Sequence, residues 1–182
     1  GRGATYDYDK ANYTIIGNGI PDMAGGFSTN VSYKGIELGL NFIYKLGGKL
    51  YDGAYKDVAD DGYYWERIRS ENYYKNMWTP THTDASEPAL SGSDLTDAMQ
   101  YSTRHLHDAT FLRLKTLSLA YTLPKTLTNR IWLSNLRVFF NAENLLTFAK
   151  YKDADPEVNN YSTRGWETPI GKTFVFGIEI TI

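Results

Sequence analysis

The sequence predicts an all-β fold of antiparallel strands, and three observations support this prediction. Five segments alternate apolar with polar residues at a period of two, which is typical of strands that bury one face. Glu37, Lys45, Arg137, Glu143 and Glu179 all lie on the polar phase, which chance would produce about once in thirty cases. Short and long connections between the segments alternate along the chain.

The first two strands are expected over residues 27–33 and 36–46, joined by a tight turn at Lys34 and Gly35. Two strands joined in this way form a β-hairpin. On the second strand, apolar residues at every second position face away from Glu37, Asn41 and Lys45. The apolar phase of this strand comprises Ile36, Leu38, Leu40, Phe42, Tyr44 and Leu46.

The third strand is expected over residues 111–123, where Leu117, Leu119 and Tyr121 share the apolar phase. Upstream, Arg113 and Lys115 fall on that same phase. Two explanations stay open: a β-bulge shifts the register, or this end of the strand lies beyond the apolar zone.

The last two strands are expected over residues 135–147 and 172–182. The polar phase of the first carries Arg137, Asn141 and Glu143, and its single aromatic residue is Phe139. The final strand sets five large apolar residues against a phase that contains Glu179. One face of each strand therefore avoids charge.

The connections indicate what kind of all-β protein this is. Residues 34–35 and 124–134 are short connections, whereas residues 51–109 and 148–171 are long and lie on the opposite rim. Outer-membrane β-barrels have short periplasmic turns and long extracellular loops, and a soluble sandwich has no need of this asymmetry. Residues 63–78 could hold a short helix within the longer loop. Tyr33, Tyr121 and Trp132 lie at the short-connection ends, where an interfacial aromatic belt would be found.

Composition narrows the classes further. With 42% hydrophobic and 22% charged residues among 182, the chain is not disordered along its length. The 19 basic and 21 acidic residues leave a net charge of −2, which argues against a nucleic-acid partner. No run approaches 18 apolar residues, which excludes a transmembrane helix, whereas membrane strands carry only a weak hydropathy signal.

No motif for catalysis is present. The chain lacks a nucleophile elbow, a phosphate-binding loop, a dinucleotide fingerprint, an HExxH zinc helix and any cysteine, so we expect no enzyme, catalytic residue, cofactor or metal. His105, His107 and Asp108 could approach one ion, but no further residue has ligand spacing. The acidic segment 57–61 resembles a calcium site only in its charge, and calcium binding there stays open.

Exposed aromatic side chains in the longest loop are the candidate contacts for a substrate or a covering protein. Flat rings with a polar edge suit stacking on sugars and packing against proteins. The alternative is that they cover the small core of the loop itself. The six candidates are Tyr63, Tyr64, Trp65, Tyr73, Tyr74 and Trp78.

Several strings, taken in order, closely resemble the carboxyl-terminal barrel strands of SusC/RagA-type TonB-dependent outer-membrane transporters. The resemblance extends over roughly residues 19–182 and also includes residues 33–38 and 78–80. The four strings are residues 111–124 (F-L-R-L-K-T-L-S-L-A-Y-T-L-P), 136–147 (L-R-V-F-F-N-A-E-N-L-L-T), 150–158 (K-Y-K-D-A-D-P-E-V) and 173–178 (T-F-V-F-G-I).

This resemblance implies that the chain is a transmembrane segment of about five strands in a barrel of about 22 strands. It implies an importer of oligosaccharides or peptides in the outer membrane of a Gram-negative bacterium. The implied partners are a plug and the remaining strands, a SusD-like surface lipoprotein, the TonB complex through a missing amino-terminal part, and outer-membrane lipid. The chain opens with Gly1 and has no initiator methionine, so we expect a fragment or a processed chain. All of its residues, 1–182, would belong to the carboxyl-terminal portion of the transporter barrel.

Within such a barrel, the polar phase would face the lumen. The expected lumen-facing residues are Glu37, Asn41, Lys45, Arg137, Asn141, Glu143 and Glu179. The alternative is a soluble β-sandwich that binds carbohydrate through its aromatic loops. The two differ in whether the apolar faces meet lipid or one another.

Overall fold

The computed structural model describes residues 10, 14–59, 62, 66–90, 102–157 and 162–182. The chain divides into two compact units, each described here by itself. The sheet unit comprises residues 20–48, 108–157 and 168–182, and the loop unit comprises residues 1–19, 49–107 and 158–167.

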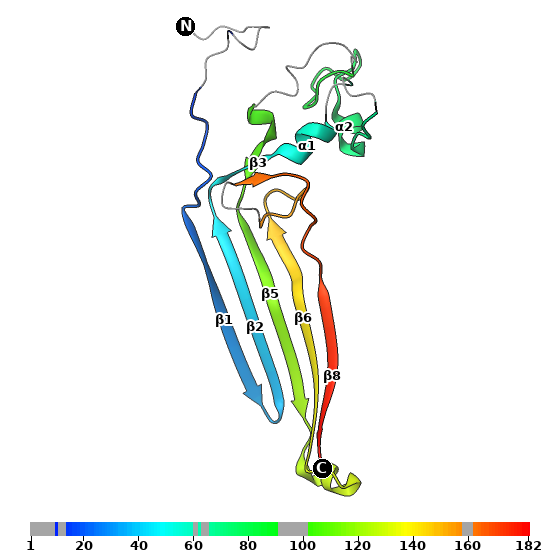
Figure 1. The fold of residues 1–182 in the computed structure, drawn as a ribbon. Coiled ribbons are helices and arrows are strands. Elements are labelled where there is room, and N and C mark those ends of the chain that lie inside the picture. Colours follow the sequence, from blue (N-terminus) through cyan, green and yellow to red (C-terminus); the bar gives the residue numbers. More distant parts are fainter. Residues whose placement is uncertain (1–9, 11–13, 60–61, 63–65, 91–101, 158–161) are drawn as a thin grey trace. The chain divides into compact units, whose positions relative to one another are not determined.

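The sheet unit is built on one antiparallel sheet of five strands in the order β1-β2-β5-β6-β8 (Figure 1). This confirms the expected all-β antiparallel fold. Within the described residues β1 pairs only with β2, and β8 only with β6, so both edges of the sheet are open. The strands are β1 Met23–Tyr33, β2 Ile36–Leu46, β5 Phe111–Thr122, β6 Asn135–Ala149 and β8 Thr173–Thr181.

The strand bounds agree with the expected ranges to within two residues, except at the start of β1. This strand begins at Met23, rather than at residue 27. Gly25 and Gly26 lie in the additional part, and because glycine has no side chain they add nothing to an alternating pattern.

Cross-strand partners point to the same side of a sheet, so the register shows which residues share a face. One row crosses all five strands through Val31, Leu38, Leu119, Phe140 and Phe176. The side chains on this apolar face are uncovered: Phe176 is 78% exposed and Ile178 is 65% exposed. Within the described residues of the sheet unit no second sheet covers this face, as a β-sandwich would require.

A β-bulge in β5 settles the placement of Arg113. The register with β2 shifts between Asn41 and Phe42, which face Thr116 and Leu114, so Lys115 is the extra residue. The bulge moves Leu114 onto the apolar face and Arg113 onto the polar face, because one added residue reverses the alternation.

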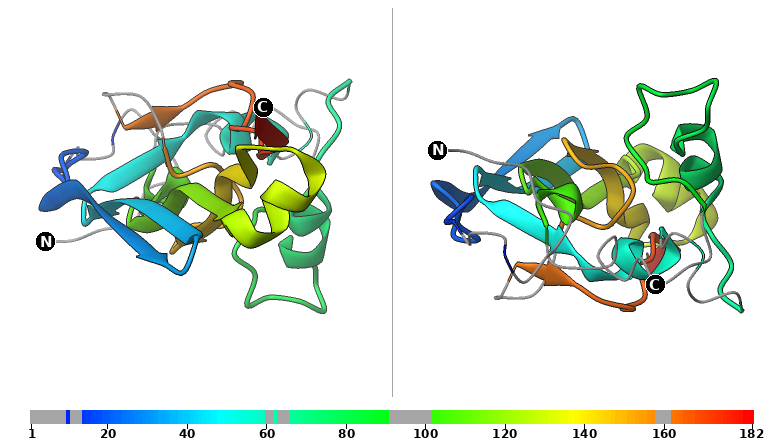
Figure 2. Two further views of the ribbon diagram at one scale, coloured as in Figure 1. Left: turned by 90° about the horizontal axis from the view of Figure 1, so that it is seen from below. Right: turned by 90° about the horizontal axis from the view of Figure 1, so that it is seen from above.

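The connections at one end of the sheet are compact. Lys34 and Gly35 turn with φ of 48° and 86°, a left-handed pair that suits a two-residue hairpin. The connection between β5 and β6 coils into α3 Lys125–Thr128 and the 3₁₀ turn η4 Asn129–Ile131 (Figure 2). These turns were not expected, because α3 and η4 are each about one turn long and contain one large apolar residue apiece, too few to show an apolar period.

The loop unit holds a second, three-stranded sheet in the order β4-β3-β7. Its short helices have side-chain caps: the Asp52 carboxylate accepts from the Tyr55 backbone N–H, and the Ser70 hydroxyl accepts from Tyr73 N–H. The helix expected within residues 63–78 is α2. The elements are β3 Lys49–Asp52, α1 Gly53–Val58, α2 Glu71–Asn76, η3 Thr103–His105, β4 Leu106–Asp108 and β7 Thr163–Arg164.

None of the helices in the described ranges is both long and apolar enough to cross a membrane.

Candidate functional site

The register brings the seven residues expected on the polar phase onto one face of the sheet unit. Asn41 and Glu143 both pair with Thr116, and Asn141 pairs with Ser118 in the next row. Glu37 pairs with Ala120, and Lys45 pairs with Phe111 above the bulge. Arg137 and Glu179 are direct partners. That this polar face lines a lumen stays a prediction.

Arg137 joins three strands at one end of the polar face. Its guanidinium bonds the Glu37 carboxylate of β2 and the Glu179 carboxylate of β8, each at 3.1 Å. The guanidinium also lies over the ring of Phe139, with its carbon 5.7 Å from the ring centroid. Phe139 packs directly on Gly177, its partner in β8, where a side chain would collide with the ring. This explains why an aromatic residue occurs on the polar phase.

A groove of about 540 Å³, here called the inner groove, lies beside this cluster. Small residues in adjacent rows leave the space open, because Gly39 pairs with Ser118 and Glu37 pairs with Ala120. Its other polar lining residues include Asn30, Ser32, Asn141 and the three charged residues of the Arg137 cluster. The inner groove therefore offers hydrogen-bond donors and acceptors beside one guanidinium and two carboxylates.

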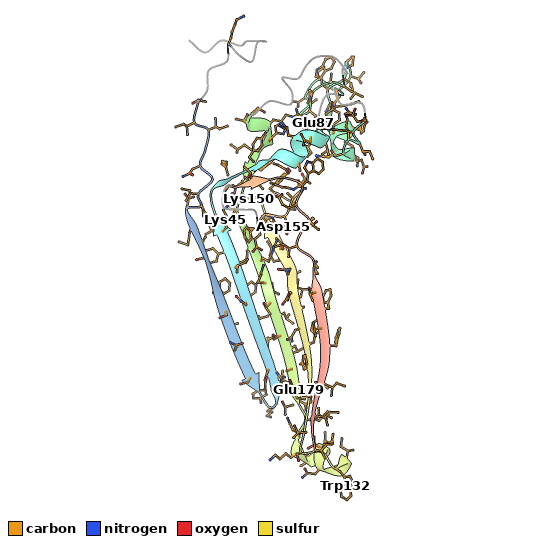
Figure 3. All side chains as sticks on the ribbon, in the orientation of Figure 1. Lys45, Glu87, Trp132, Lys150, Asp155 and Glu179 are labelled. Atoms are coloured by element: carbon orange, nitrogen blue, oxygen red, sulfur yellow. The ribbon has the colours of Figure 1, made fainter. Side chains whose placement is uncertain are left out.

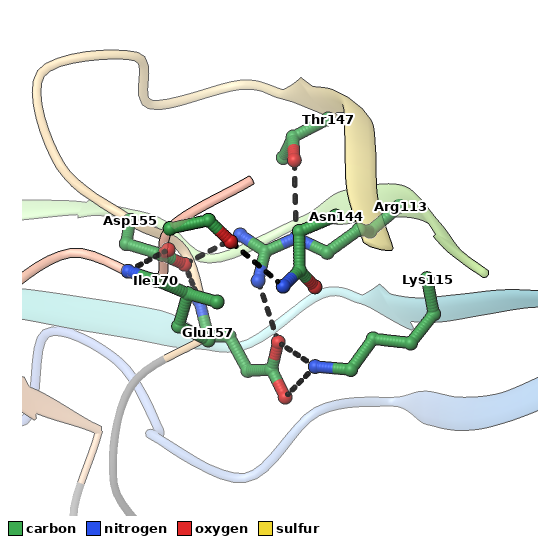
Figure 4. A network of polar contacts seen from close by, with 8 residues as sticks. Arg113, Lys115, Asn144, Thr147, Asp155, Glu157 and Ile170 are labelled. Carbon is green, nitrogen blue, oxygen red and sulfur yellow. Dashed lines mark hydrogen bonds and ion pairs between the residues drawn. The ribbon is translucent and has the colours of Figure 1, made fainter. Parts of the chain in front are cut away.

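Arg113 is the centre of a second polar cluster near the other end of β5 (Figure 4). Only 3% of its side chain is exposed, and its guanidinium bonds Asp155 and Glu157, each at 2.6 Å. Its Nε also donates to the Thr147 hydroxyl at 3.0 Å. The buried cation is thus neutralised by two carboxylates, as a buried charge requires.

The Arg113 cluster fixes the segment after β6 to the sheet. Lys115, the bulged residue, adds an ion pair to Glu157 at 3.1 Å. Asp155 accepts backbone N–H bonds from Glu157 and Ile170, at 2.9 and 3.3 Å. Asn144, with φ of 53°, donates to the Gly171 carbonyl at 3.1 Å. Both ends of the long connection between β6 and β8 are therefore held at one place.

The predicted aromatic contacts of the loop unit fall into three groups. Tyr74 and Trp78 are 49% and 43% exposed, so their rings are available to a partner. Tyr73 has no exposed surface, and its hydroxyl donates to the Pro88 carbonyl at 3.0 Å. Tyr73 is therefore wrong as a contact residue, because its ring fills the core of the loop unit. Tyr63, Tyr64 and Trp65 lie outside the described residues.

A polar centre holds the segments of the loop unit together. The Arg104 guanidinium bonds Glu87 at 2.5 Å and donates to the Ala59 carbonyl at 2.6 Å. The Tyr55 hydroxyl donates to Glu87 at 2.8 Å. Burial, and then the bond to the Glu87 carboxylate, raise the pKa of Tyr55 to about 12, so this phenol keeps its proton and remains a donor.

The metal-site candidates do not come together. His105 is fully buried between the rings of Tyr51 and Tyr55, with centroids at 6.1 and 6.4 Å. Asp108 pairs instead with Lys150 at 2.9 Å. Within the described ranges no group of three or more acidic or histidine side chains could hold a metal ion.

The acidic segment 57–61 can be followed only at its first residue. The Asp57 carboxylate pairs with Arg67 at 3.3 Å and accepts from the Trp166 indole at 3.3 Å. Asp60 and Asp61 lie outside the described residues. Asp57 therefore serves the packing of the loop unit.

Sequence reasoning did not find the Arg113 cluster or the Glu87–Arg104 pair. A signal for the first was present, since Arg113 occupied the apolar phase of its strand, and a cation in such a position calls for partners. The partners themselves lie 42 and 44 residues away, in a loop whose path has no period.

Comparisons with known proteins agree on one family. The chain is 30% identical over 187 residues to TonB-dependent receptor P3 of Formosa agariphila, covering 96% of this chain and 18% of that protein. TonB-dependent receptor P39 of the same organism is 27% identical over 183 residues, with the same coverage. No family model matches the chain.

Solved structures of the RagAB peptide transporter share the fold. One has a TM-score of 0.77 at 31% identity, covering 97% of this chain and 19% of that one. Another, in a state described as closed-closed, has a TM-score of 0.74 at 30% identity, covering 97% and 20%. The chain thus spans about a fifth of the length of these proteins, which are receptors and importers and not enzymes.

Proposed function

The chain belongs to the TonB-dependent transporters of the SusC/RagA type, and from this premise we propose that it forms part of the barrel wall and loops of an outer-membrane nutrient importer. Its apolar face would contact lipid, and its polar face would line the lumen. The host would be a Gram-negative bacterium, and the cargo would be oligosaccharides or peptides.

One observation carries this proposal: the separation of the two faces across all five strands. Each of the five strands exposes apolar side chains on one face, among them Val31, Ile36, Leu119, Val138 and Phe176, whereas Arg113 and Arg137 lie on the other face. A face of exposed aromatic and aliphatic residues is stable against lipid hydrocarbon, while charged groups there would cost several kcal/mol. The open edges of β1 and β8 require further strands, because unpaired backbone groups are costly in lipid.

The partners follow from the position of the chain in such a transporter. The remaining strands would pair with β1 and β8, and a plug would contact the polar face. A TonB complex would act through an amino-terminal part outside this chain. A SusD-like lipoprotein would cover the extracellular loops, where Tyr74 and Trp78 are the described rings able to contact it or the cargo. The description of RagAB as a peptide importer favours peptides as the first cargo to test.

Topology provides the test, because the chain has no cysteine of its own. Single cysteines at Ser86 in the loop unit and at Asn129 in the connection between β5 and β6 are both at exposed positions. We expect a membrane-impermeant maleimide to label the Ser86→Cys transporter in intact cells, and the Asn129→Cys transporter only after the outer membrane is opened.

Labelling of Asn129→Cys but not Ser86→Cys in intact cells would reverse the topology. A chain that stays soluble, monomeric and cooperatively folded without detergent would overturn the barrel assignment. Uptake of labelled peptides and oligosaccharides by cells, with and without TonB, then assigns the cargo.

A further inference from the structure

An apolar groove of about 700 Å³, here called the outer groove, lies on the exposed face of the sheet unit, at the short-connection end. Its lining residues come from all five strands of the sheet. Its large apolar lining residues are Tyr33, Ile36, Leu119, Tyr121, Val138, Phe139, Phe140 and Phe176.

The lining includes one charged residue, Lys34. Its ammonium lies 5.2 Å from the centroid of the Tyr33 ring, within the range of a cation–π contact. The turn that carries it is anchored, since Thr122 N–H donates to the Gly35 carbonyl at 2.8 Å. A side chain at residue 35 would meet the Thr122 carbonyl, so glycine is required there. The geometry therefore holds a cation at the rim of an apolar groove.

We propose that the outer groove binds a phospholipid of the periplasmic leaflet, with an acyl chain along the apolar lining and the headgroup phosphate on Lys34. This site rests on the proposed function, because it requires the apolar face to be embedded in a bilayer. No covalent step is involved.

Two features favour a phospholipid over a protein segment as the occupant. The outer groove is continuous with the exposed apolar rows. The lipid that covers those rows in a bilayer would therefore also reach the groove. The cation stands beyond the last residues of β1 and β5, at the level of the tyrosines that mark a bilayer interface. An amphiphile with an anionic head and an apolar tail matches this arrangement of charge and surface.

The neighbouring connection supplies a comparison within the same end of the sheet. Leu127, Ile131 and Trp132 are exposed there, Trp132 at 89%, next to Lys125 and Arg130 in the chain. Figure 3 places Trp132 at the end of the sheet opposite Lys45. Lys125 and Arg130 lie outside the lining of the outer groove. They would therefore attract lipid headgroups in general but would not hold one particular lipid molecule.

The test uses the full-length transporter that carries this chain, inserted in bilayers of phosphatidylcholine with a minority of phosphatidylglycerol. After mild extraction, native mass spectrometry counts the phosphatidylglycerol molecules retained per barrel. We expect Lys34→Gln to lower the occupancy of one retained molecule by about fivefold, the effect of one basic residue at a membrane surface. Val138→Trp, which fills the groove and leaves Lys34 in place, should lower the same occupancy.

Two controls separate the outcomes. Arg130→Gln removes a cation from the same end, and Lys172→Gln removes one from the start of β8, at the opposite end. Neither should change the retained molecule. An equal loss from Lys34→Gln and Arg130→Gln would mean diffuse attraction only and would overturn the site. Retention of a copurifying protein in place of lipid would overturn it too, as would a transporter that inserts and imports normally but retains no phospholipid. A transporter that fails to insert at all would instead overturn the proposed function.

Discussion

The two units of the chain differ in how far they bury their own large side chains. The loop unit has its own interior, where Leu50, Ala59 and Tyr73 have no exposed surface, and Asp52 is paired with Arg164 at 2.7 Å. The sheet unit exposes most of its large side chains, including Phe148 at 63% and Phe174 at 52%. The loop unit is therefore suited to water by itself, whereas the sheet unit depends on surroundings that the chain does not supply.

The largest expected effect concerns the interior of the loop unit. Tyr73→Ala should lower the free energy of unfolding of this unit by about 3 to 5 kcal/mol, because it removes a fully buried ring and its bond to Pro88. Tyr74→Ala removes a half-exposed ring from the next position of the same helix and should cost much less. Hydrogen exchange of the membrane-inserted transporter measures both.

If Tyr73→Ala also prevented membrane insertion of the strands, the two units would not be energetically separate. An unchanged exchange rate in the loop unit would contradict its having a core of its own.

The second-largest expected effect is the difference in folding free energy between substitutions on the two faces of the sheet. Leu40→Arg or Phe140→Arg places a cation on the apolar face and should cost roughly 2 to 4 kcal/mol of folding free energy near the bilayer midplane. Asn41→Arg, on the adjacent residue and the polar face, should cost far less. Equilibrium unfolding in phospholipid bilayers makes the comparison, and equal costs would refute the assignment of faces.

The Arg113 cluster is the part of the sheet unit that most resembles an interior. Arg113→Met should lower stability by about 1 to 3 kcal/mol, because it leaves Asp155 and Glu157 without their buried partner. Lys115→Met removes a half-exposed partner of Glu157 and should cost under about 1 kcal/mol. In Arg113→Met the Ile170 amide, bonded to Asp155, should exchange faster. A larger effect of the lysine replacement would mean that burial does not set the strength of this cluster.

The smallest expected effect is the pH dependence of the stability that Asp108 contributes near the loop end of β5. Hydrogen bonds from Thr110, and then from Lys150, hold the pKa of Asp108 below its ordinary value. Because the pKa is lower in the folded state, the ionised Asp108 carboxylate stabilises the fold at pH values above about 4. This contribution to stability is lost as the pH falls below about 4 and the carboxylate is protonated. The exposed pair should contribute up to about 1 kcal/mol, so Asp108→Asn should be less stable at pH 7 and match the parent chain in acid. Denaturant titrations at the two pH values test this, and a difference that persists in acid would assign the effect to packing.

Local sequence pattern was enough to predict the strands of the sheet and the separation of their faces. Alternation is a local property, so Leu38 and Leu40 on one side and Glu37 and Asn41 on the other need no knowledge of distant residues. The register of the structure placed the seven polar-phase residues on one face because each strand was already amphipathic. Three of the four strings that carry the family resemblance lie largely on these strands, and the fourth, residues 150–158, follows β6.

Features that depend on distant partners could be read only from the folded chain. The local pattern allowed two explanations for the polar residues at the start of β5, and the bulge at Lys115 shows that the register shifts there. The carboxylates that pair with Arg113 lie 42 and 44 residues away in the sequence. Tyr73 and Tyr74 are neighbours of the same type, yet one is buried and the other half exposed. The bond between Arg164 and Asp52 joins residues 112 positions apart. Burial and ion pairing depend on which segments meet in space, and periodicity within one segment carries no information about that.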